Sequence, residues 1–152
     1  MGDSRKKENL DLLKRIGEVR MEAAREEVQR AYKLLENSTQ KLEQTQGLIK
    51  ELETNMRDST GPGKLFNVLD LQRTRQYLQS QESCLETQQQ EYLHHKRLTQ
   101  ELVSVLVQKK VDVELFDKAQ QRLQARSDKE ERLKQIKSLD ELWLLKRGSH
   151  VK

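Results

Sequence analysis

Proline is almost absent from this sequence, since Pro62 is the only one in 152 residues, and there are only six glycines. A proline inside a helix costs about 3 kcal/mol, so its scarcity permits helices of many turns. Aromatic residues make up 4% of the chain. Hydrophobic residues make up 34%, against roughly 45–50% in average proteins. This composition excludes a large compact core and leaves a thin, regularly spaced one.

Cysteine and long apolar runs are also scarce. Cys84 is the only cysteine, which excludes an intramolecular disulfide, and we expect it to pack at the edge of a helix pair beside Leu85. No stretch approaches the roughly 18 apolar residues that cross a bilayer. Residues 1–13 are charged and lack the apolar centre of a signal peptide. We therefore expect a soluble, cytoplasmic protein.

Charge is abundant but mixed, with 29 basic and 25 acidic residues and a net charge of +4. Nucleic-acid binders instead cluster their Lys and Arg side chains, so no nucleic-acid partner is expected. The segment Gly61–Lys64 lacks the strand and the Ser or Thr of a phosphate-binding loop. His94 and His95 diverge by about 100° on a helix and cannot face one metal ion. We expect no catalytic site, no cofactor and no metal.

One break divides the chain at Asp58–Gly63, which contains the only proline and two of the glycines. Gly-Pro-Gly favours a turn, because glycine adopts positive φ and proline has no N–H to continue a helix. Before the break, small and apolar residues recur at spacings of three and four, the heptad pattern of a coiled coil. Leu10, Leu13 and Ile16 extend this pattern imperfectly toward the start. Its main members are Met21, Ala24, Val28, Ala31, Leu35, Ser38, Leu42, Thr45, Ile49, Leu52 and Met56.

A second heptad series follows the break. Its two positions together predict a narrow seam, because one is largely apolar and the other stays polar until Leu102. The first position holds Leu71, Leu78, Leu85, Tyr92, Thr99, Leu106 and Val113, and the second holds Thr74, Gln81, Gln88, His95, Leu102, Lys109 and Phe116.

These two series predict an all-α protein whose two long helices form an antiparallel coiled-coil hairpin, as a single domain over residues 1–152. We expect the first helix over about residues 6–57, the turn over 58–64 and the second helix over about 65–147. Helices joined by a short turn are antiparallel neighbours, so the first helix should cover the second only to about residue 118. The remaining C-terminal helix overhangs, and a lone helix is marginal in water unless a partner encloses it.

The only tryptophan, Trp143, lies near the end of this predicted overhang. Tryptophan is enriched at binding hot spots. Trp143 and its neighbouring leucines therefore form either a docking knob for a partner or a segment that folds back onto the helix pair, and the sequence leaves both open.

Three stretches of the sequence carry a resemblance to a known family. Residues 22–31 (EAAREEVQRA) are similar to its first helix, residues 65–81 (beginning LFNVLDL) to its segment after the turn, and residues 137–142 (KSLDEL) to the ending of its flagellar members. Over residues 10–147 the chain resembles the FliJ/YscO proteins, the central stalks of type III export in bacterial flagella and injectisomes. Val68 and Trp143 depart from the family pattern, which leaves the choice between the two systems open.

The resemblance implies a non-enzymatic stalk that inserts into a hexameric export ATPase and stimulates it. It also implies a link to the cytoplasmic domain of the membrane export gate, with export chaperones as further candidate partners, and a cytoplasmic location at the inner membrane. Two sets of site residues follow from the resemblance. Docking in the ATPase pore would use Leu139, Asp140, Glu141, Leu142 and Trp143. Binding to the export gate would use Ile49, Leu52, Met56, Leu71 and Leu78, for which a role in the helix seam alone is the alternative.

Two other classes of protein fit the same pattern of helices. A coiled-coil chaperone would hold unfolded clients with its frayed ends, and a generic scaffold would self-assemble. Stimulation of an ATPase at sub-stoichiometric amounts separates the stalk from the chaperone. A monomeric state in light scattering argues against the scaffold.

Overall fold

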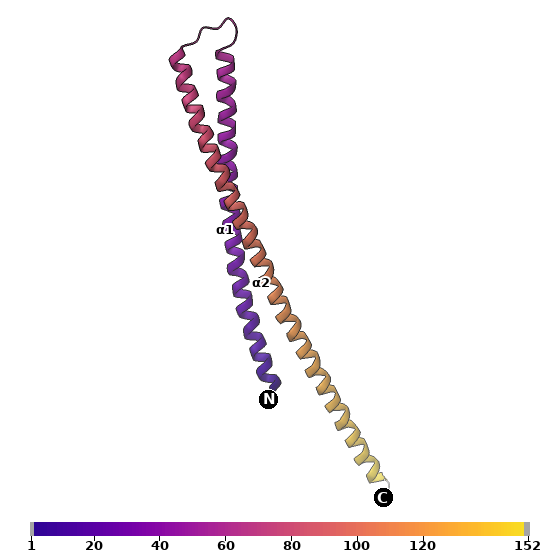
Figure 1. Cartoon of the computed structure of the whole chain (residues 1–152). Helices are drawn as coiled ribbons and strands as arrows, with labels where there is room; N and C mark the ends of the chain where they lie inside the picture. Colours follow the sequence, from indigo (N-terminus) through magenta and orange to yellow (C-terminus); the bar gives the residue numbers. More distant parts are fainter. Residues whose placement is uncertain (1, 151–152) are drawn as a thin grey trace. The chain divides into compact units, whose positions relative to one another are not determined.

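The structure, a computed structural model, describes residues 2–150, with side chains over residues 2–148. Within that range it consists of two helices, α1 at Gly2–Ser59 and α2 at Val68–His150, joined by the loop 60–67 (Figure 1). The helices run in opposite directions and pack against each other, which confirms the predicted all-α hairpin. Within the described residues neither helix holds a segment long and apolar enough to cross a bilayer.

The loop contains the turn that Gly61-Pro62-Gly63 predicts. The Lys64 amide donates to the Gly61 carbonyl oxygen at 3.2 Å, and Gly63 has a φ of 79°. Proline at the second position and a positive-φ glycine at the third are typical of a type II β-turn. Asn67 then caps α2, because its Oδ1 accepts a hydrogen bond from the Leu69 amide at 3.0 Å. This cap starts α2 at Val68 instead of about residue 65.

Both predicted heptad series are buried or half-buried from end to end, which confirms the seam between the helices. Thr99 is only 3% exposed, and its hydroxyl donates to the His95 carbonyl oxygen at 2.7 Å, so the buried polar atom has a partner. Between residues 17 and 45 of α1, one heptad position holds only small residues, and each of them is buried. Small side chains there leave space for larger α2 side chains to pack close to the α1 backbone. These residues are Gly17, Ala24, Ala31, Ser38 and Thr45.

The chain divides into two compact units, each of which contains part of both helices. Unit 2, Ala24–Leu106, contains the loop and most of the small-residue stripe on α1. Unit 1 consists of Met1–Ala23 and Val107–Lys152. In this unit charged side chains bridge the two helices, since Lys14 Nζ lies 2.9 Å from Asp117 Oδ1 and Lys7 Nζ lies 3.3 Å from Ser127 Oγ.

Unit 1 corrects two details of the sequence prediction. The contact between Lys7 and Ser127 shows that α1 follows α2 beyond residue 118, because α1 already starts at Gly2 and α2 starts late. Leu13 and Ile16 are 44% and 39% exposed, so their place in the seam was wrong. The strict three-and-four spacing continues instead through the half-buried Lys14 and the buried Gly17.

The two glycines inside α1 should respond differently to alanine. A Cβ on Gly47 would meet nothing within 4 Å, whereas a Cβ on Gly17 would lie 3.2 Å from Val113 Cγ2. We expect Gly47→Ala to raise the free energy of unfolding by about 0.5–1 kcal/mol, because alanine loses less backbone entropy in a helix. At Gly17 the crowding of Val113 opposes this gain. Urea denaturation measures both, and equal stabilisation would contradict the close packing at Gly17.

Candidate functional site

The C-terminal part of α2 is the largest surface without cover from α1. Every side chain over residues 129–148 is exposed, although the backbone stays helical. Trp143 is 61% exposed, and the guanidinium carbon of Arg147 lies 5.2 Å from its ring centroid, a cation–π contact. Trp143 thus stacks on a residue of its own helix, and α2 does not fold back over residues 129–148.

The five residues assigned to pore docking occupy more than one turn of this exposed segment. Leu142 and Trp143 lie three and four residues after Leu139 and share its face, whereas the exposed Asp140 and Glu141 point to other sides of the helix. Leu139, Leu142 and Trp143 are 64%, 61% and 61% exposed. All five are accessible to a partner, but they do not form one flat patch.

Two apolar residues of the same surface are not among the five residues assigned to pore docking. Leu133 and Ile136 are 56% and 55% exposed and lie on the face of Leu139 and Trp143, at helical spacing. Their spacing was visible in the sequence, but the prediction followed the family-like ending instead. We call Leu133, Ile136, Leu139, Leu142, Trp143, Leu144 and Leu145 the tail surface.

The five residues assigned to the export gate have a different environment. Each is half-buried and belongs to one of the two heptad series of unit 2. A partner could reach only their partly exposed edges while the helices stay paired. They are Ile49, Leu52, Met56, Leu71 and Leu78.

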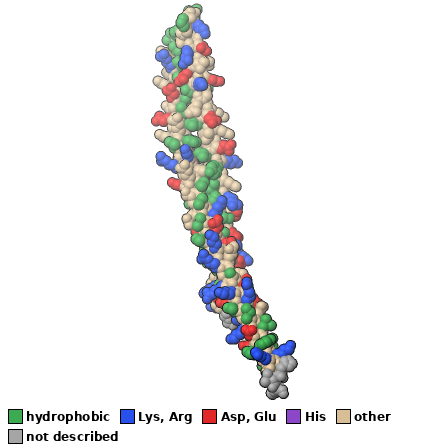
Figure 2. Space-filling view, turned by 90° about the vertical axis from the view of Figure 1, so that its right-hand side faces the viewer, with side chains coloured by type: hydrophobic (Ala, Val, Ile, Leu, Met, Phe, Trp, Pro, Cys, Tyr) green, Lys and Arg blue, Asp and Glu red, His purple; other side chains and the backbone are tan. Residues whose placement is uncertain are grey.

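A more accessible apolar surface lies beside them, at the loop. Leu65 is fully exposed, and Phe66, Val68 and Leu69 are 49%, 60% and 62% exposed. Hydrophobic side chains reach the surface at this end of unit 2 (top of Figure 2). We call these four residues the tip surface. Leu65 and Phe66 also line a pocket of about 260 Å³, whose other residues include Met56 and Leu71. The run Leu-Phe-x-Val-Leu directly after the turn was the sequence signal for this surface.

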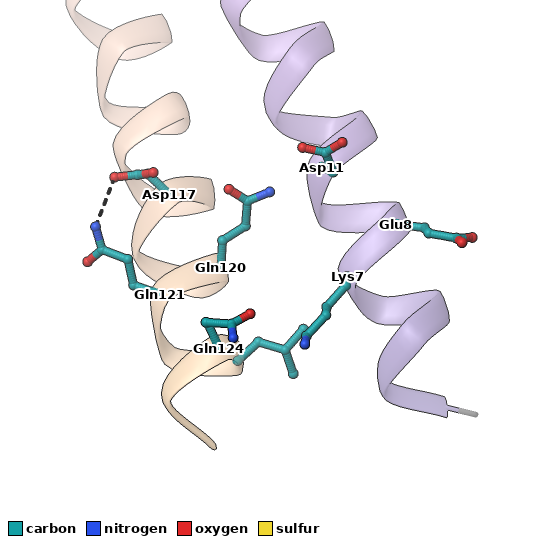
Figure 3. A pocket seen from close by; sticks show the side chains of 8 residues that line it. Lys7, Glu8, Asp11, Asp117, Gln120, Gln121 and Gln124 are labelled. Carbon is teal, nitrogen blue, oxygen red and sulfur yellow. Dashed lines mark hydrogen bonds between the residues drawn. The ribbon is translucent and has the colours of Figure 1, made fainter. Parts of the chain in front are cut away.

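Unit 1 carries two open grooves of about 500 Å³ each, both lined by residues of α1 and α2. The first is lined by Lys7, Glu8 and Asp11 of α1 and by Asp117, Leu123 and three glutamines of α2. Figure 3 shows that Lys7 points from α1 toward α2, whereas Glu8 points away from α2. The Gln121 amide donates to Asp117 Oδ2 at 3.3 Å (Figure 3). Lys7 is the only cation of this groove.

Lys14 and Asp117 form the ion pair beside this first groove. The hydrogen bond from the Lys14 ammonium to Asp117 raises the pKa of Lys14 above its ordinary value of 10.5, although desolvation opposes the shift. The charges of Glu18 and Asp11 act in the same direction as Asp117. The folded state therefore holds the Lys14 proton more tightly than the unfolded chain does.

This raised pKa predicts how stability depends on pH. The contribution of Lys14 is fully present below pH 10.5 and is lost as the pH rises through the higher pKa of the folded state. At pH 7 we expect Lys14→Met to unfold at a lower temperature than wild type. At about pH 11.5–12 this difference between the two melting temperatures should shrink. The exposed Lys33→Met serves as the control and should show no such pH-dependent difference. A Lys14→Met difference that does not change with pH would contradict the ion pair.

The remaining candidate groups for chemistry among the described residues are His94, His95 and Cys84. The rings of His94 and His95 lie 5.8 Å apart, and His95 Nδ1 is buried without a hydrogen-bond partner. Cys84 is exposed, so its expected packing at the edge of the seam was wrong. Among the described residues, no three His, Cys, Asp or Glu side chains lie close enough together to hold a metal ion.

The surfaces described above are therefore suited to contact with a partner molecule. The tail surface and the tip surface expose large apolar side chains, and the grooves of unit 1 add charged walls. Exposed apolar patches of this kind are typical of protein interaction sites. Comparison of the chain with protein families, with curated proteins and with solved structures gave no match.

Proposed function

We propose that this chain is the central stalk of a bacterial type III export apparatus, which inserts into a hexameric export ATPase and stimulates it. The observation that carries this proposal is the uncovered end of α2, where residues 129–148 are exposed in unit 1. A lone helix is poorly stable in water, and its exposed leucines favour burial in a partner. A partner that encloses the helix would bury these leucines and would also stabilise the helical conformation.

The arrangement of the tail surface favours a partner that surrounds the helix. Leu142, Trp143, Leu144 and Leu145 are consecutive and are 61–72% exposed. At about 100° per residue, four consecutive side chains point in all directions around a helix. A flat or grooved partner covers only one side of such a helix, whereas the pore of a ring-shaped hexamer covers every side. The family-like ending at residues 137–142 supports the same assignment.

The second contact of the proposed stalk is the export gate. The tip surface is a better candidate for contact with the gate than the five seam residues. Its side chains are exposed, so a partner can bury them without separating the two helices. Phe66 is a partly exposed aromatic residue of the kind that is enriched at protein interfaces. In this proposal the chain is not an enzyme and works in the cytoplasm next to the inner membrane. Export chaperones are further candidate partners.

Stimulation of ATP hydrolysis tests the proposal directly. We expect one chain per hexamer to give the full increase in the hydrolysis rate of the export ATPase from the same genome, because one pore holds one helix. A titration at fixed ATPase concentration should therefore saturate near a molar ratio of one chain to six subunits. A coiled-coil chaperone would leave the rate unchanged or require excess chain. Either of those results would exclude the stalk.

A further inference from the structure

The second groove of unit 1 differs from the first in the sign of its charged residues. It is formed by Lys6, Asn9 and Leu10 of α1 and Ala119, Arg122, Leu123 and Arg126 of α2, so every charged residue that lines it is basic. Its floor is apolar, because Leu10, Ala119 and Leu123 are half-buried between the helices. The first groove, by contrast, contains the carboxylates of Glu8, Asp11 and Asp117.

The heptad repeat extends this basic and apolar flank along both helices. Residues seven apart lie on the same side of a coiled-coil helix. One heptad beyond Lys6 lies Leu13, which is 44% exposed, and one heptad before Arg122 lies Leu115, which is 57% exposed. Lys129 follows Arg122 at the same interval. The second groove therefore has exposed leucines toward one end and cations toward the other, and we call this surface the basic groove.

We propose that the basic groove binds an acidic amphipathic helix of a partner protein. A third helix laid between two paired helices buries its apolar side chains on the floor, in the manner of helix-in-groove recognition. Its carboxylates would then pair with Lys6, Arg122 and Arg126, whose side chains are exposed. Arg126 Nε lies 3.6 Å from Glu130 Oε1, but this exposed pair is weak and can be exchanged for a partner carboxylate.

The apolar part of the groove is what favours a helix over a phosphate-rich partner. Nucleic acid would use the three cations but would leave the floor and the exposed Leu13 and Leu115 without contacts. An acidic helix with leucines at its heptad positions uses both. The proposal rests on unit 1 alone and is independent of the stalk function.

Fluorescence anisotropy with a labelled synthetic peptide tests the basic groove. The probe is a designed 21-residue peptide with leucine at the a and d positions, glutamate at e and g and the helix former alanine elsewhere, and its partner is the full-length chain. We expect saturable binding that is at least about tenfold weaker for Lys6→Glu/Arg122→Glu/Arg126→Glu, because rim charges that change sign repel the peptide. Leu13→Ala/Leu123→Ala should also weaken binding.

A matched variant separates the groove from general electrostatic attraction. Lys33→Glu/Arg57→Glu/Arg73→Glu changes the same number of charges at exposed positions of unit 2 and should bind the peptide nearly as wild type does. Equal loss in both triple variants would overturn the proposal, as would equal binding of a lysine version of the peptide. Tighter binding of an oligonucleotide or of anionic vesicles, lost in the groove variant, would also overturn it. Circular dichroism confirms that each variant is folded. Should the glutamate variant unfold, Lys6→Gln/Arg122→Gln replaces it.

Discussion

Removal of residues 129–152 is expected to return ATP hydrolysis by the export ATPase to its basal rate. The deleted segment carries the whole tail surface, on which the proposed insertion into the pore depends. The contact between Lys7 and Ser127 is retained, so both heptad series and their seam stay intact. We therefore expect the melting temperature of the truncated chain to stay within a few degrees of wild type. Hydrolysis assays and circular dichroism measure the two properties on the same protein.

A full-length variant with substitutions distinguishes the effect of the tail's apolar side chains from the effect of the tail's length. Leu133→Gln, Ile136→Gln, Leu139→Gln and Trp143→Gln together keep a helix-forming sequence of the same length but remove the apolar stripe. We expect this full-length variant to stimulate as poorly as the truncated chain. Full stimulation by the truncated chain would rule out insertion of the tail. Full stimulation by the substituted chain would show that the tail's apolar side chains are not required.

The second large effect is expected in the seam of unit 2, at Ala31. This residue is 4% exposed and belongs to the small-residue stripe of α1. A glutamate there would place a carboxylate between the helices without a partner and would also force them apart. We expect Ala31→Glu to lower the free energy of unfolding by about 3 kcal/mol, in the range of a buried, unpaired charge.

Ala23 provides the matched control on the same helix. It is exposed, so Ala23→Glu replaces the same residue type with the same charge in water. Its effect should stay within about 0.5 kcal/mol, as for most surface substitutions. Urea denaturation followed by circular dichroism measures both variants. Similar losses in the two would mean that the stripe does not face α2.

The repeat pattern predicted the seam well because spacing alone decides which side of a helix a residue occupies. Thr99 and Gln88 were assigned to the seam by position despite their polarity, and both are buried or half-buried. Where apolar character was given more weight than spacing, at Leu13 and Ile16, the assignment failed. Lys14 occupies the seam because it pairs with Asp117, a partner 103 positions away that no local pattern reveals.

The candidate sites were harder to predict than the fold, because they depend on which flanks of the two helices meet. The basic groove joins Lys6 to Arg122 and Arg126, and this juxtaposition follows from the alignment of the helices rather than from either sequence alone. Exposure of Phe66 and its neighbours could have been inferred from their place directly after the turn.

Because of the small-residue stripe, the loop also has to hold the two helices in one alignment. Ala24, Ala31 and Ser38 are so alike that sliding one helix past the other by seven residues would present α2 with a nearly equivalent surface. Without a constraint on the alignment of the helices, several staggered pairings would therefore compete on similar terms, as in other repetitive coiled coils. The tight turn at Gly61–Lys64 leaves no slack for such a slide. A longer, flexible linker in its place should thus yield a mixture of staggered hairpins rather than a single fold.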